Sequence, residues 1–321
     1  MKHRAGSASG MTLVELMVGM AVGLFVATVA ISTFISTRTL NVVNSSSTRM
    51  TENARLATET LHTDLRSAGF AGCRTLEQRL DGPPLVVLAG GLNAGFLVGG
   101  NSGVLGYTAT GTGHSPALPT ALSDAAPNRL LNSDILTVRV PADNVALGIT
   151  GSMASQSGNL QLGTVGPIAV GDVALVANCK AAALFQVTGV ASNELSHDAG
   201  SLIPGNSTTD LGHVFRSDAT VYRMQTRHYY VAPGIRAGTN SLWRLTVPAP
   251  AGGAPTPEEV ASGIDRLLIT YGVDSDATPD LNVNQYLTAS GVTDWDRVLS
   301  APCTSIGELP RSPAERRLPA L

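Results

Sequence analysis

The sequence predicts an α+β protein in which a long N-terminal α-helix packs on an antiparallel, β-rich globular domain. Two observations carry this prediction. Residues 11–35 are apolar or small apart from one glutamate, and no proline occurs between Met11 and Gly82. After residue 71, short runs rich in β-branched residues alternate with Gly, Pro, Asn and Asp, which is typical of strands and turns.

The composition excludes several classes of protein. The chain has 321 residues, with 21 Lys and Arg against 24 Asp and Glu and a net charge of −3. Charged residues make up 14%, below the roughly 25% of an average soluble domain. Neither a disordered chain nor a nucleic-acid-binding surface is indicated. Three cysteines are too few for a disulfide-dense scaffold or a four-thiolate zinc site.

Residues 11–35 are long enough to cross a membrane, because about 20 apolar residues span a bilayer as a helix. Lys2 and Arg4 precede this run, so the positive-inside rule places the amino end in the cytoplasm and the remainder across the membrane. The alternatives are a plain signal-anchor helix and a cleaved secretory signal. A secretory signal is disfavoured, because its apolar region is only about 7–15 residues long.

Glu15 is the one charge inside this run. An ionised carboxylate within a bilayer is costly and needs a partner. A glutamate in the first turn of a helix is also favoured by the helix dipole. The dipole explains why Glu15 is tolerated, but not why it stands in a uniformly apolar run.

The segment Gly10-Met11-Thr12-Leu13-Val14-Glu15-Leu16 resembles the processing site of type IV prepilins. The resemblance implies that residues 1–10 are a leader, which prepilin peptidase removes by cutting after Gly10. The same enzyme would methylate Met11, where the commonest residue in the family is Phe. Glu15 would then pair with the amino-terminal charge of a neighbouring subunit, so that both charges lose their water together.

The helix is predicted to continue beyond the membrane, over residues 11–70 in all. Apolar or small residues recur at alternating spacings of three and four, and Gly69 is a plausible stop. This stripe is thin and suits packing on a domain; the alternative is a coiled-coil stalk. The stripe consists of Leu40, Val43, Ser47, Met50, Ala54, Ala57, Leu61, Leu65 and Ala68.

The residues near the end of the predicted helix resemble one particular group of type IV pilins. Residues 51–55 and 64–73, which read TENAR and DLRSAGFAGC, resemble the corresponding segments of PilW-type minor pilins of type IV pili. Later blocks resemble the same family in the same order: residues 174–179, 184–188, 228–231, 241–245, 271–274 and 294–298.

Residues 71–321 are predicted to form the β-rich globular domain. The strand-like runs are Leu85–Leu88, Asp134–Val140, Asp172–Val176, Leu184–Val190, Ala219–Val231, Ser241–Val247 and Arg266–Val273. The Gly-, Ala- and Ser-rich stretches 89–116 and 146–166 are predicted to be exposed loops or ragged strands.

Two of the three cysteines are predicted to form a disulfide, and the third is not. Cys73 and Cys179 both lie in the translocated part, an oxidising compartment in which we expect them to pair. Two buried free thiols are the alternative, because spacing alone does not determine connectivity. Cys303 is then left over.

The carboxyl end, residues 301–321, departs from the PilW-type pattern. The family continues with an alternating strand after Ser300, whereas this chain has Pro302 and then an Arg- and Pro-rich tail. Proline cannot serve a central strand, so an unpaired sheet edge is expected here. A frame change and natural divergence are both compatible with this tail.

Motifs of catalysis are missing from the sequence. It has no H-E-x-x-H, G-x-S-x-G, P-loop or C-x-x-C, and its six histidines are scattered. Residues 274–285 match only the first half of a calcium loop, because Pro279 replaces the required glycine and Gln285 the final glutamate. Asn206 begins a formal glycosylation sequon. We therefore expect no enzyme activity, no cofactor and no metal.

The resemblance implies a structural minor prepilin that takes part in initiating and assembling the type IV pilus. Its partners would be prepilin peptidase, other minor pilins, the major pilin and the inner membrane, with no direct binding of nucleic acid. The protein would cross the inner membrane once, with a periplasmic domain, before it enters the pilus. The alternatives are a type II secretion pseudopilin and a membrane-anchored periplasmic adhesin.

Overall fold

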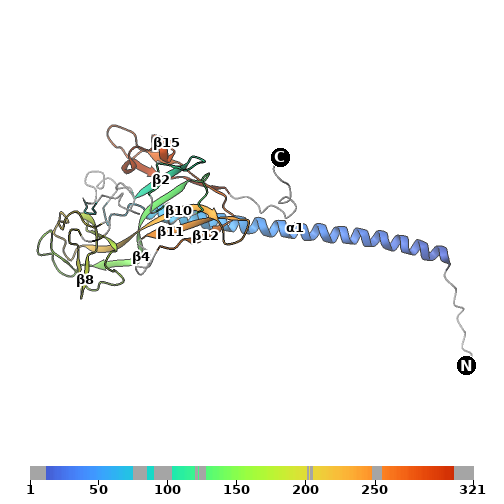
Figure 1. Ribbon diagram of the computed structural model, residues 1–321, viewed down its shortest axis with the longest axis horizontal. Helices are drawn as coiled ribbons and strands as arrows, with labels where there is room; N and C mark the ends of the chain where they lie inside the picture. Colours follow the sequence, from blue (N-terminus) through green and yellow to red (C-terminus); the bar gives the residue numbers. More distant parts are fainter. Residues whose placement is uncertain are drawn as a thin grey trace, which may run out of the picture. The chain divides into compact units, whose positions relative to one another are not determined.

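A computed structural model describes residues 12–74, 85–89, 103–119, 122, 128–200, 202, 205–247 and 255–306 (Figure 1). It has the predicted α+β character, with one long N-terminal helix, α1 (Leu13–Ser67), and a mostly antiparallel β-rich domain. The chain divides into two compact units, residues 1–51 and 52–321. The final turns of α1 therefore belong to the same unit as the sheets.

The first unit contains α1 as far as Thr51. Its side chains are exposed over residues 12–45, and this includes large apolar ones such as Leu24 and Phe25, which are 70% and 71% exposed. Its hydroxyl groups bond back to the helix: the Thr28 hydroxyl donates to Leu24 O (2.8 Å), and Thr33 and Thr37 do likewise one turn back. Such bonds satisfy hydroxyls within the helix itself, so they fit an apolar surrounding.

The second unit begins with the turns of α1 that are packed. Ala57, Leu61 and Asp64 are buried, at the three- and four-residue spacing that the sequence predicts for a packed face. The α-helix ends at Ser67, where Gly69 adopts φ +66° and donates its N–H to Arg139 O (3.2 Å). The backbone of Gly103 lies against this end, because a Cβ on Gly103 would come within 2.1 Å of Gly69 N.

The largest sheet is built around β10 (Thr220–Pro233), which appears beside the packed turns of α1 in Figure 1. β4 (Ile135–Gly148) pairs along one side of it, while β6 (Val173–Ala177) and then β11 (Asn240–Val247) pair along the other. The sheet also contains β1 (Leu85–Val86), β2 (Val104–Ala109), β3 (His114–Ser115), β7 (Ala182–Gln186) and β12 (Glu258–Ser262). All these neighbours are antiparallel except β1 and β7, which are parallel.

Three smaller sheets complete the domain. One joins β5 (Leu160–Gln161), β9 (Glu194–Ser196) and β8 (Gly189–Ala191). A second pairs β13 (Arg266–Ile269) with β17 (Cys303–Ile306). The third joins β15 (Gln285–Leu287), β14 (Tyr271–Val273) and β16 (Val298–Ser300), with the short 3-10 helices η3 (Ala289–Gly291) and η4 (Trp295–Arg297) between β15 and β16.

Two main cores hold the domain together. In one, Ala57 and Leu61 of α1 pack with side chains of the large sheet such as Leu136 and Tyr229, and with Leu267 of β13. The other core lies away from the helix and includes Phe185, Leu195 and Phe215. The domain therefore buries apolar surface without help from the first unit.

Every predicted strand run contains a strand, but the sequence misses others. β2 lies in the stretch 89–116, which was predicted to be exposed loop or ragged strand, and half of the residues of β2 are buried. β12 was not foreseen as a strand. The loop prediction for residues 90–102, which are part of the same stretch, lies outside the described residues.

The carboxyl end corrects a second expectation. Cys303–Ile306 form β17, which pairs with β13 in the register Ile269 to Cys303, so the chain remains in a sheet beyond Ser300. Pro302 lies between β16 and β17, and its carbonyl accepts the Thr270 N–H (3.2 Å). The proline lacks only its own N–H, and its carbonyl still serves the pairing. Residues 307–321 lie outside the described residues.

Candidate functional site

The amino-terminal turn of α1 contains a reciprocal capping arrangement. The Glu15 carboxylate accepts the Thr12 N–H (3.0 Å) and the Thr12 hydroxyl (3.2 Å), while the Glu15 N–H reaches the Thr12 hydroxyl oxygen (3.3 Å). This is a capping box, which satisfies backbone donors at a helix start. The pattern T-x-x-E was readable in the sequence, but we did not foresee it. Gly10 and Met11, the predicted cleavage and methylation residues, lie outside the described residues.

The helix α1 is long and apolar enough to cross a membrane, as judged by its length and composition. Glu15 is the only acidic residue in its first turn. It is an exposed carboxylate among exposed apolar side chains, including Leu16 and Met17. In a membrane it would therefore be an ionisable group surrounded by lipid-facing residues, a position that calls for an opposite charge.

A disulfide joins Cys73 to Cys179, with 5.1 Å between their Cα atoms, as predicted. Cys73 follows the helix end, and Cys179 lies in the turn between β6 and β7, where the Asn178 side chain accepts the N–H groups of Lys180 (2.9 Å) and Ala181 (2.8 Å). The bond spans 106 residues of sequence and ties the helix end to the large sheet. Loops of about this length give a stabilisation of roughly 4.7 kcal/mol in the chain-entropy description.

Side-chain packing also holds the end of α1 against the large sheet. The Phe70 ring meets Tyr222 of β10 edge-on, with 4.8 Å between ring centroids. Gly72 adopts φ +74°, and a Cβ there would come within 2.7 Å of the Ala177 Cβ. The turn after α1 therefore lies close against β6, which brings the two cysteines within bonding distance.

A buried ion pair attaches α1 to the centre of the large sheet, and sequence reasoning missed it. Arg227 Nη1 donates to Asp64 Oδ1 (2.6 Å), and the Tyr229 hydroxyl donates to Asp64 Oδ2. Asp64 is 4% exposed and Arg227 is 8% exposed, so the pair is almost fully removed from water. The only sign of this ion pair in the sequence is that the charged Asp64 falls at the helical spacing of the buried Ala57 and Leu61.

The Tyr229 end of this network continues toward the surface. Burial, followed by the charge of Asp64, raises the pKa of Tyr229 well above its usual value, so the phenol stays protonated. Arg244 of β11 is hydrogen-bonded to Tyr229 and donates to Glu258 of β12 (2.7 Å). The network runs from the helix through β10 and β11 to β12 and positions the packed part of α1. We call Asp64, Arg227 and Tyr229 the helix clamp.

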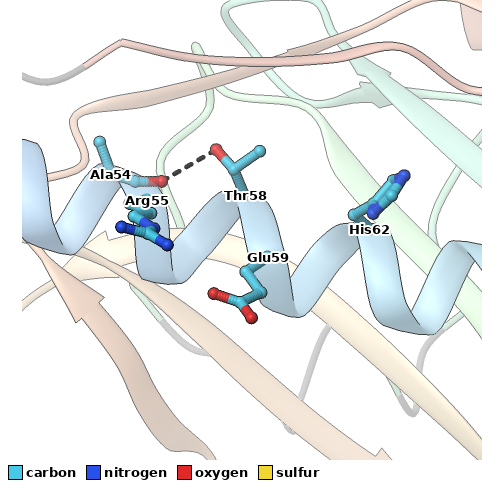
Figure 2. Close-up of a pocket in the computed structure, with 5 residues that line it drawn as sticks. All are labelled: Ala54, Arg55, Thr58, Glu59 and His62. Carbon is cyan, nitrogen blue, oxygen red and sulfur yellow. Dashed lines mark hydrogen bonds between the residues drawn. The ribbon is translucent and has the colours of Figure 1, made fainter.

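A shallow hollow of about 520 Å³ lies on the outer surface of α1 and is lined by Ala54, Arg55, Thr58, Glu59 and His62 (Figure 2). All of these residues come from the helix. The one hydrogen bond among them runs from the Thr58 hydroxyl to Ala54 O (2.8 Å). The hollow is therefore a helix surface and not a cleft between elements.

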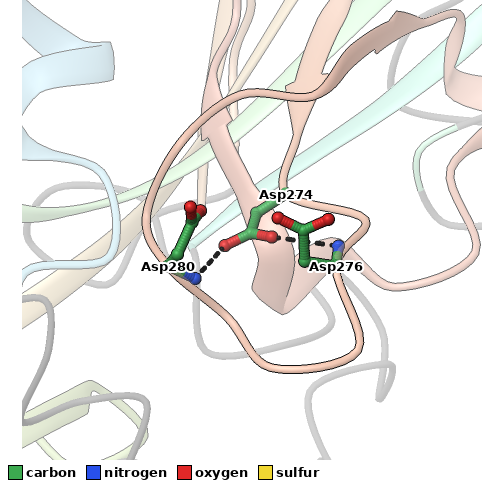
Figure 3. A group of neighbouring side chains, drawn as sticks. All are labelled: Asp274, Asp276 and Asp280. Carbon is green, nitrogen blue, oxygen red and sulfur yellow. Dashed lines mark hydrogen bonds between the residues drawn. The ribbon is translucent and has the colours of Figure 1, made fainter.

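The acidic loop after β14 gathers Asp274, Asp276 and Asp280, whose nearest carboxylate atoms all lie within 4.8 Å of one another (Figure 3). Asp274 is buried, and its carboxylate accepts the N–H groups of Asp276 (3.2 Å), Asp280 (2.9 Å) and Leu281 (3.0 Å). These bonds shape the loop with the chain's own donors. The half-matched calcium pattern thus forms a real cluster that acts as a turn organiser.

The remaining sequence candidates are separated by the fold. Nδ1 of the buried His228 is hydrogen-bonded to the Thr137 hydroxyl (2.8 Å), and Nε2 of His197 is hydrogen-bonded to Gly158 O (2.9 Å). Asn206 of the sequon is 2% exposed, and its amide bonds to the Gln186 backbone at both ends. Cys303 is a free, half-buried thiol whose pKa is raised to about 12 by burial and by Asp134.

In a comparison with protein families, residues 228–302 match the PilW family, described as Type IV Pilus-assembly protein W. Comparison with curated proteins and with solved structures finds no match. The matched residues begin in β10 and run through β16. They include Tyr229 of the helix clamp and most of the core that packs on Ala57 and Leu61.

The family match agrees with the rest of the molecule. A helix of membrane-spanning length and composition precedes the matched domain, which fits a protein of the inner membrane. A protein of this family interacts with other components of pilus assembly. The match of residues 228–302 supports a PilW-type type IV pilus protein.

Proposed function

We propose that the protein is a structural minor prepilin that helps to initiate assembly of the type IV pilus. It is inserted in the inner membrane with its amino end in the cytoplasm and its β-rich domain in the periplasm. Prepilin peptidase cuts after Gly10 and methylates Met11. The mature subunit then joins other minor pilins and the major pilin.

The observation that carries this proposal is the PilW family match in a domain that packs on the end of a membrane-length helix. An anchored enzyme would need a catalytic constellation, whereas the interactions described above are structural. A type II secretion pseudopilin shares the leader and the helix, and the family match favours PilW. An adhesin role in the loops of the domain has no specific observation in its favour.

Glu15 is the residue proposed to drive assembly. Its carboxylate is exposed on an apolar helix and lies close to the amino end of the processed chain. The methylated ammonium group of a neighbouring subunit can pair with it, which removes both charges from lipid together. Thr12 holds the carboxylate of the same chain in place until then.

The processing step is tested by mass spectrometry of the mature amino terminus, in cells with and without prepilin peptidase. The proposal expects a chain that begins at methylated Met11 and depends on the peptidase. An intact Met1, or a cut near Ala30, contradicts it and would indicate a simple anchor or a secretory signal.

The assembly step is tested by Glu15→Val, with Glu52→Val as the matched control. Both changes remove one exposed glutamate from α1, but Glu52 lies beyond the apolar run. We expect Glu15→Val to reduce surface pili at least tenfold by electron microscopy while the protein stays in the membrane fraction. Glu52→Val should retain pili. Equal pilus counts in the two variants would overturn the proposed role of Glu15.

A further inference from the structure

The disulfide between Cys73 and Cys179 lies at the surface of the domain. Both cysteines are exposed, whereas Cys303, the third cysteine of the chain, is half-buried. Structural disulfides of secreted proteins resist reduction, and exposed disulfides are the ones that exchange readily with other thiols. Because both ends of this bond are exposed, it is open to thiol chemistry from outside the folded domain.

The turn that presents Cys179 is held by its own hydrogen bonds. The Asn178 N–H donates to Ala181 O (2.9 Å), and the Asn178 side-chain oxygen accepts the N–H groups of Lys180 and Ala181. The flanking residues Ala177 and Ala182 pair where β6 and β7 meet. None of these bonds involves the sulfur atoms, so the turn can keep its shape when the disulfide opens.

Basic residues stand next to both sulfur atoms in the chain. Arg74 follows Cys73, and the exposed Lys180 follows Cys179; Lys180 is the only lysine after Lys2. A basic neighbour favours the thiolate form of a cysteine. The thiolate is the species that attacks and leaves in thiol–disulfide exchange, so this setting assists the reaction.

The packing of α1 on the sheets does not pass through the disulfide. The helix clamp, together with Ala57 and Leu61 in the core, holds the packed turns of α1. Phe70 adds an edge-on contact with Tyr222 just before Cys73. Opening the bond would therefore free the chain around Cys73 and leave the helix packed.

Cys303 is unsuited to react with this disulfide. Its thiol donates to Ala301 O (3.3 Å), and burial, followed by the charge of Asp134, raises the pKa of Cys303 to about 12. The thiol is thus protonated at neutral pH and a poor nucleophile. The thiols that open the disulfide must come from another molecule, and a partner with two thiols can complete the reaction by itself.

We propose that the Cys73–Cys179 disulfide is a thiol–disulfide exchange site of the folded domain, and that its partner is a redox protein with two neighbouring thiols. Exchange switches the chain after α1 between a state tied to the β6–β7 turn and a free state. The inference depends neither on prepilin processing nor on the role of Glu15.

The exchange conserves protons and electrons. A thiolate of the partner attacks the sulfur of Cys179, at the exposed turn; a new S–S bond forms, and Cys73 leaves as a thiolate that takes up a proton. The second thiol of the partner loses its proton and attacks the mixed disulfide, which releases Cys179 as a thiol. The domain gains two thiols, and the partner is oxidised to a disulfide.

Reduction of the folded chain tests whether the bond is accessible. The full chain with Cys303→Ser, in detergent micelles, is treated with dithiothreitol with and without unfolding urea, and new thiols are counted by mass after alkylation. We expect the bond in the folded chain to open within about a hundredfold of the rate in the unfolded chain, with native tryptophan fluorescence throughout. A slower rate, or a loss of native fluorescence before thiols appear, overturns the proposal.

A protein dithiol tests the class of partner. The probe is reduced thioredoxin in which serine replaces the second cysteine of the C-x-x-C pair, so that a mixed disulfide is not resolved. We expect a covalent adduct with the folded chain, and peptide mapping should place the adduct on Cys179. An adduct on Cys73, or no adduct under conditions in which dithiothreitol opens the bond, contradicts the proposed exchange.

The double variant Cys73→Ser, Cys179→Ser represents the open state. We expect it to unfold in a single cooperative transition, at a lower melting temperature than the native chain, because the helix clamp remains. The matched control Cys303→Ser removes a thiol outside the bond and should keep the melting temperature within about 2 °C of the native value. A double variant without a cooperative transition would show that the fold requires the bond, and exchange in a folded domain would be ruled out.

Discussion

Asp64 illustrates how strongly a single side chain can hold an element in place. It accepts from both Arg227 and Tyr229 while almost fully buried. Exposed ion pairs are worth little because water screens them, whereas breaking a buried pair leaves an uncompensated charge. The clamp therefore matters less for the energy it adds than for the cost of losing one member.

Asp64→Asn should lower the free energy of unfolding of the domain by about 3–5 kcal/mol, because the Arg227 charge is left buried without its counter-ion. Glu258→Gln is the control: it removes the partner of Arg244, but the Glu258 side chain is 65% exposed, so a loss below about 1 kcal/mol is expected. Urea unfolding followed by tryptophan fluorescence measures both, since Trp243 and Trp295 lie in the domain. Equal losses would contradict a structural role for the clamp.

His228 makes the domain sensitive to acid. Burial lowers its pKa from 6.5 to about 3, so the folded protein holds it neutral. The unfolded chain takes up a proton near pH 6.5 while the folded chain does not. Stability linked to His228 is therefore full above pH 6.5 and is lost as the pH falls toward 3, by at most about 1.4 kcal/mol per pH unit.

A His228→Gln variant checks this linkage, because it removes the titrating group. Between pH 7 and pH 4, the melting temperature of the native chain should fall more steeply than that of the variant. Parallel curves would show that other groups, such as the buried carboxylates, account for the acid sensitivity.

At the scale of elements, the end of α1 depends on how closely two backbones approach. Gly103 lies against Gly69 with φ +72°, and a Cβ at residue 103 would come within 2.1 Å of Gly69 N. Gly111 has a similar φ of +83° but nothing within 4 Å of its Cβ position. A side chain at either position would be strained by the positive φ, but only at residue 103 would its Cβ also collide with the backbone of Gly69.

Gly103→Ala should therefore destabilise the domain by clearly more than Gly111→Ala, which carries only the positive-φ cost of about 1 kcal/mol. Thermal unfolding of the two variants measures the difference. A similar melting temperature for both would mean that the helix end moves away from β2 without penalty.

At the scale of the whole molecule, one helix serves two different environments. Leu61 is 3% exposed and packs in the core of the domain, whereas Leu24 is 70% exposed in the apolar unit. The same amino acid therefore has opposite roles in one element. Within the domain, helix packing is a matter of folding; in the first unit, exposed leucines suit contact with lipid or with neighbouring helices.

The paired variants Leu61→Ala and Leu24→Ala separate these roles. Leu61→Ala should cost the domain about 2–5 kcal/mol, because it leaves a cavity. Leu24→Ala should leave the tryptophan-detected melting of the domain unchanged within about 1 °C, because it removes no domain contact. A drop in melting temperature for Leu24→Ala would show that the two units are energetically coupled.

The sequence by itself determined the features that depend on local composition. A run of apolar residues without proline suffices for the membrane-length helix, and alternating spacings of three and four mark its packed face. Strand runs rich in β-branched residues, such as 219–231, became the strands of the large sheet. The oxidising compartment indicated that Cys73 and Cys179 would pair, but two free thiols stayed possible until the structure showed the bond.

Only the tertiary structure decided the features that depend on distant contacts. The partner of Asp64 is 163 residues away, so no local pattern indicates it. β2 contains Gly106, and β17 follows Pro302; both residues weaken a strand prediction. Pairing with β4 stabilises β2, and pairing with β13 stabilises β17. Packing against neighbours outweighs intrinsic strand preference.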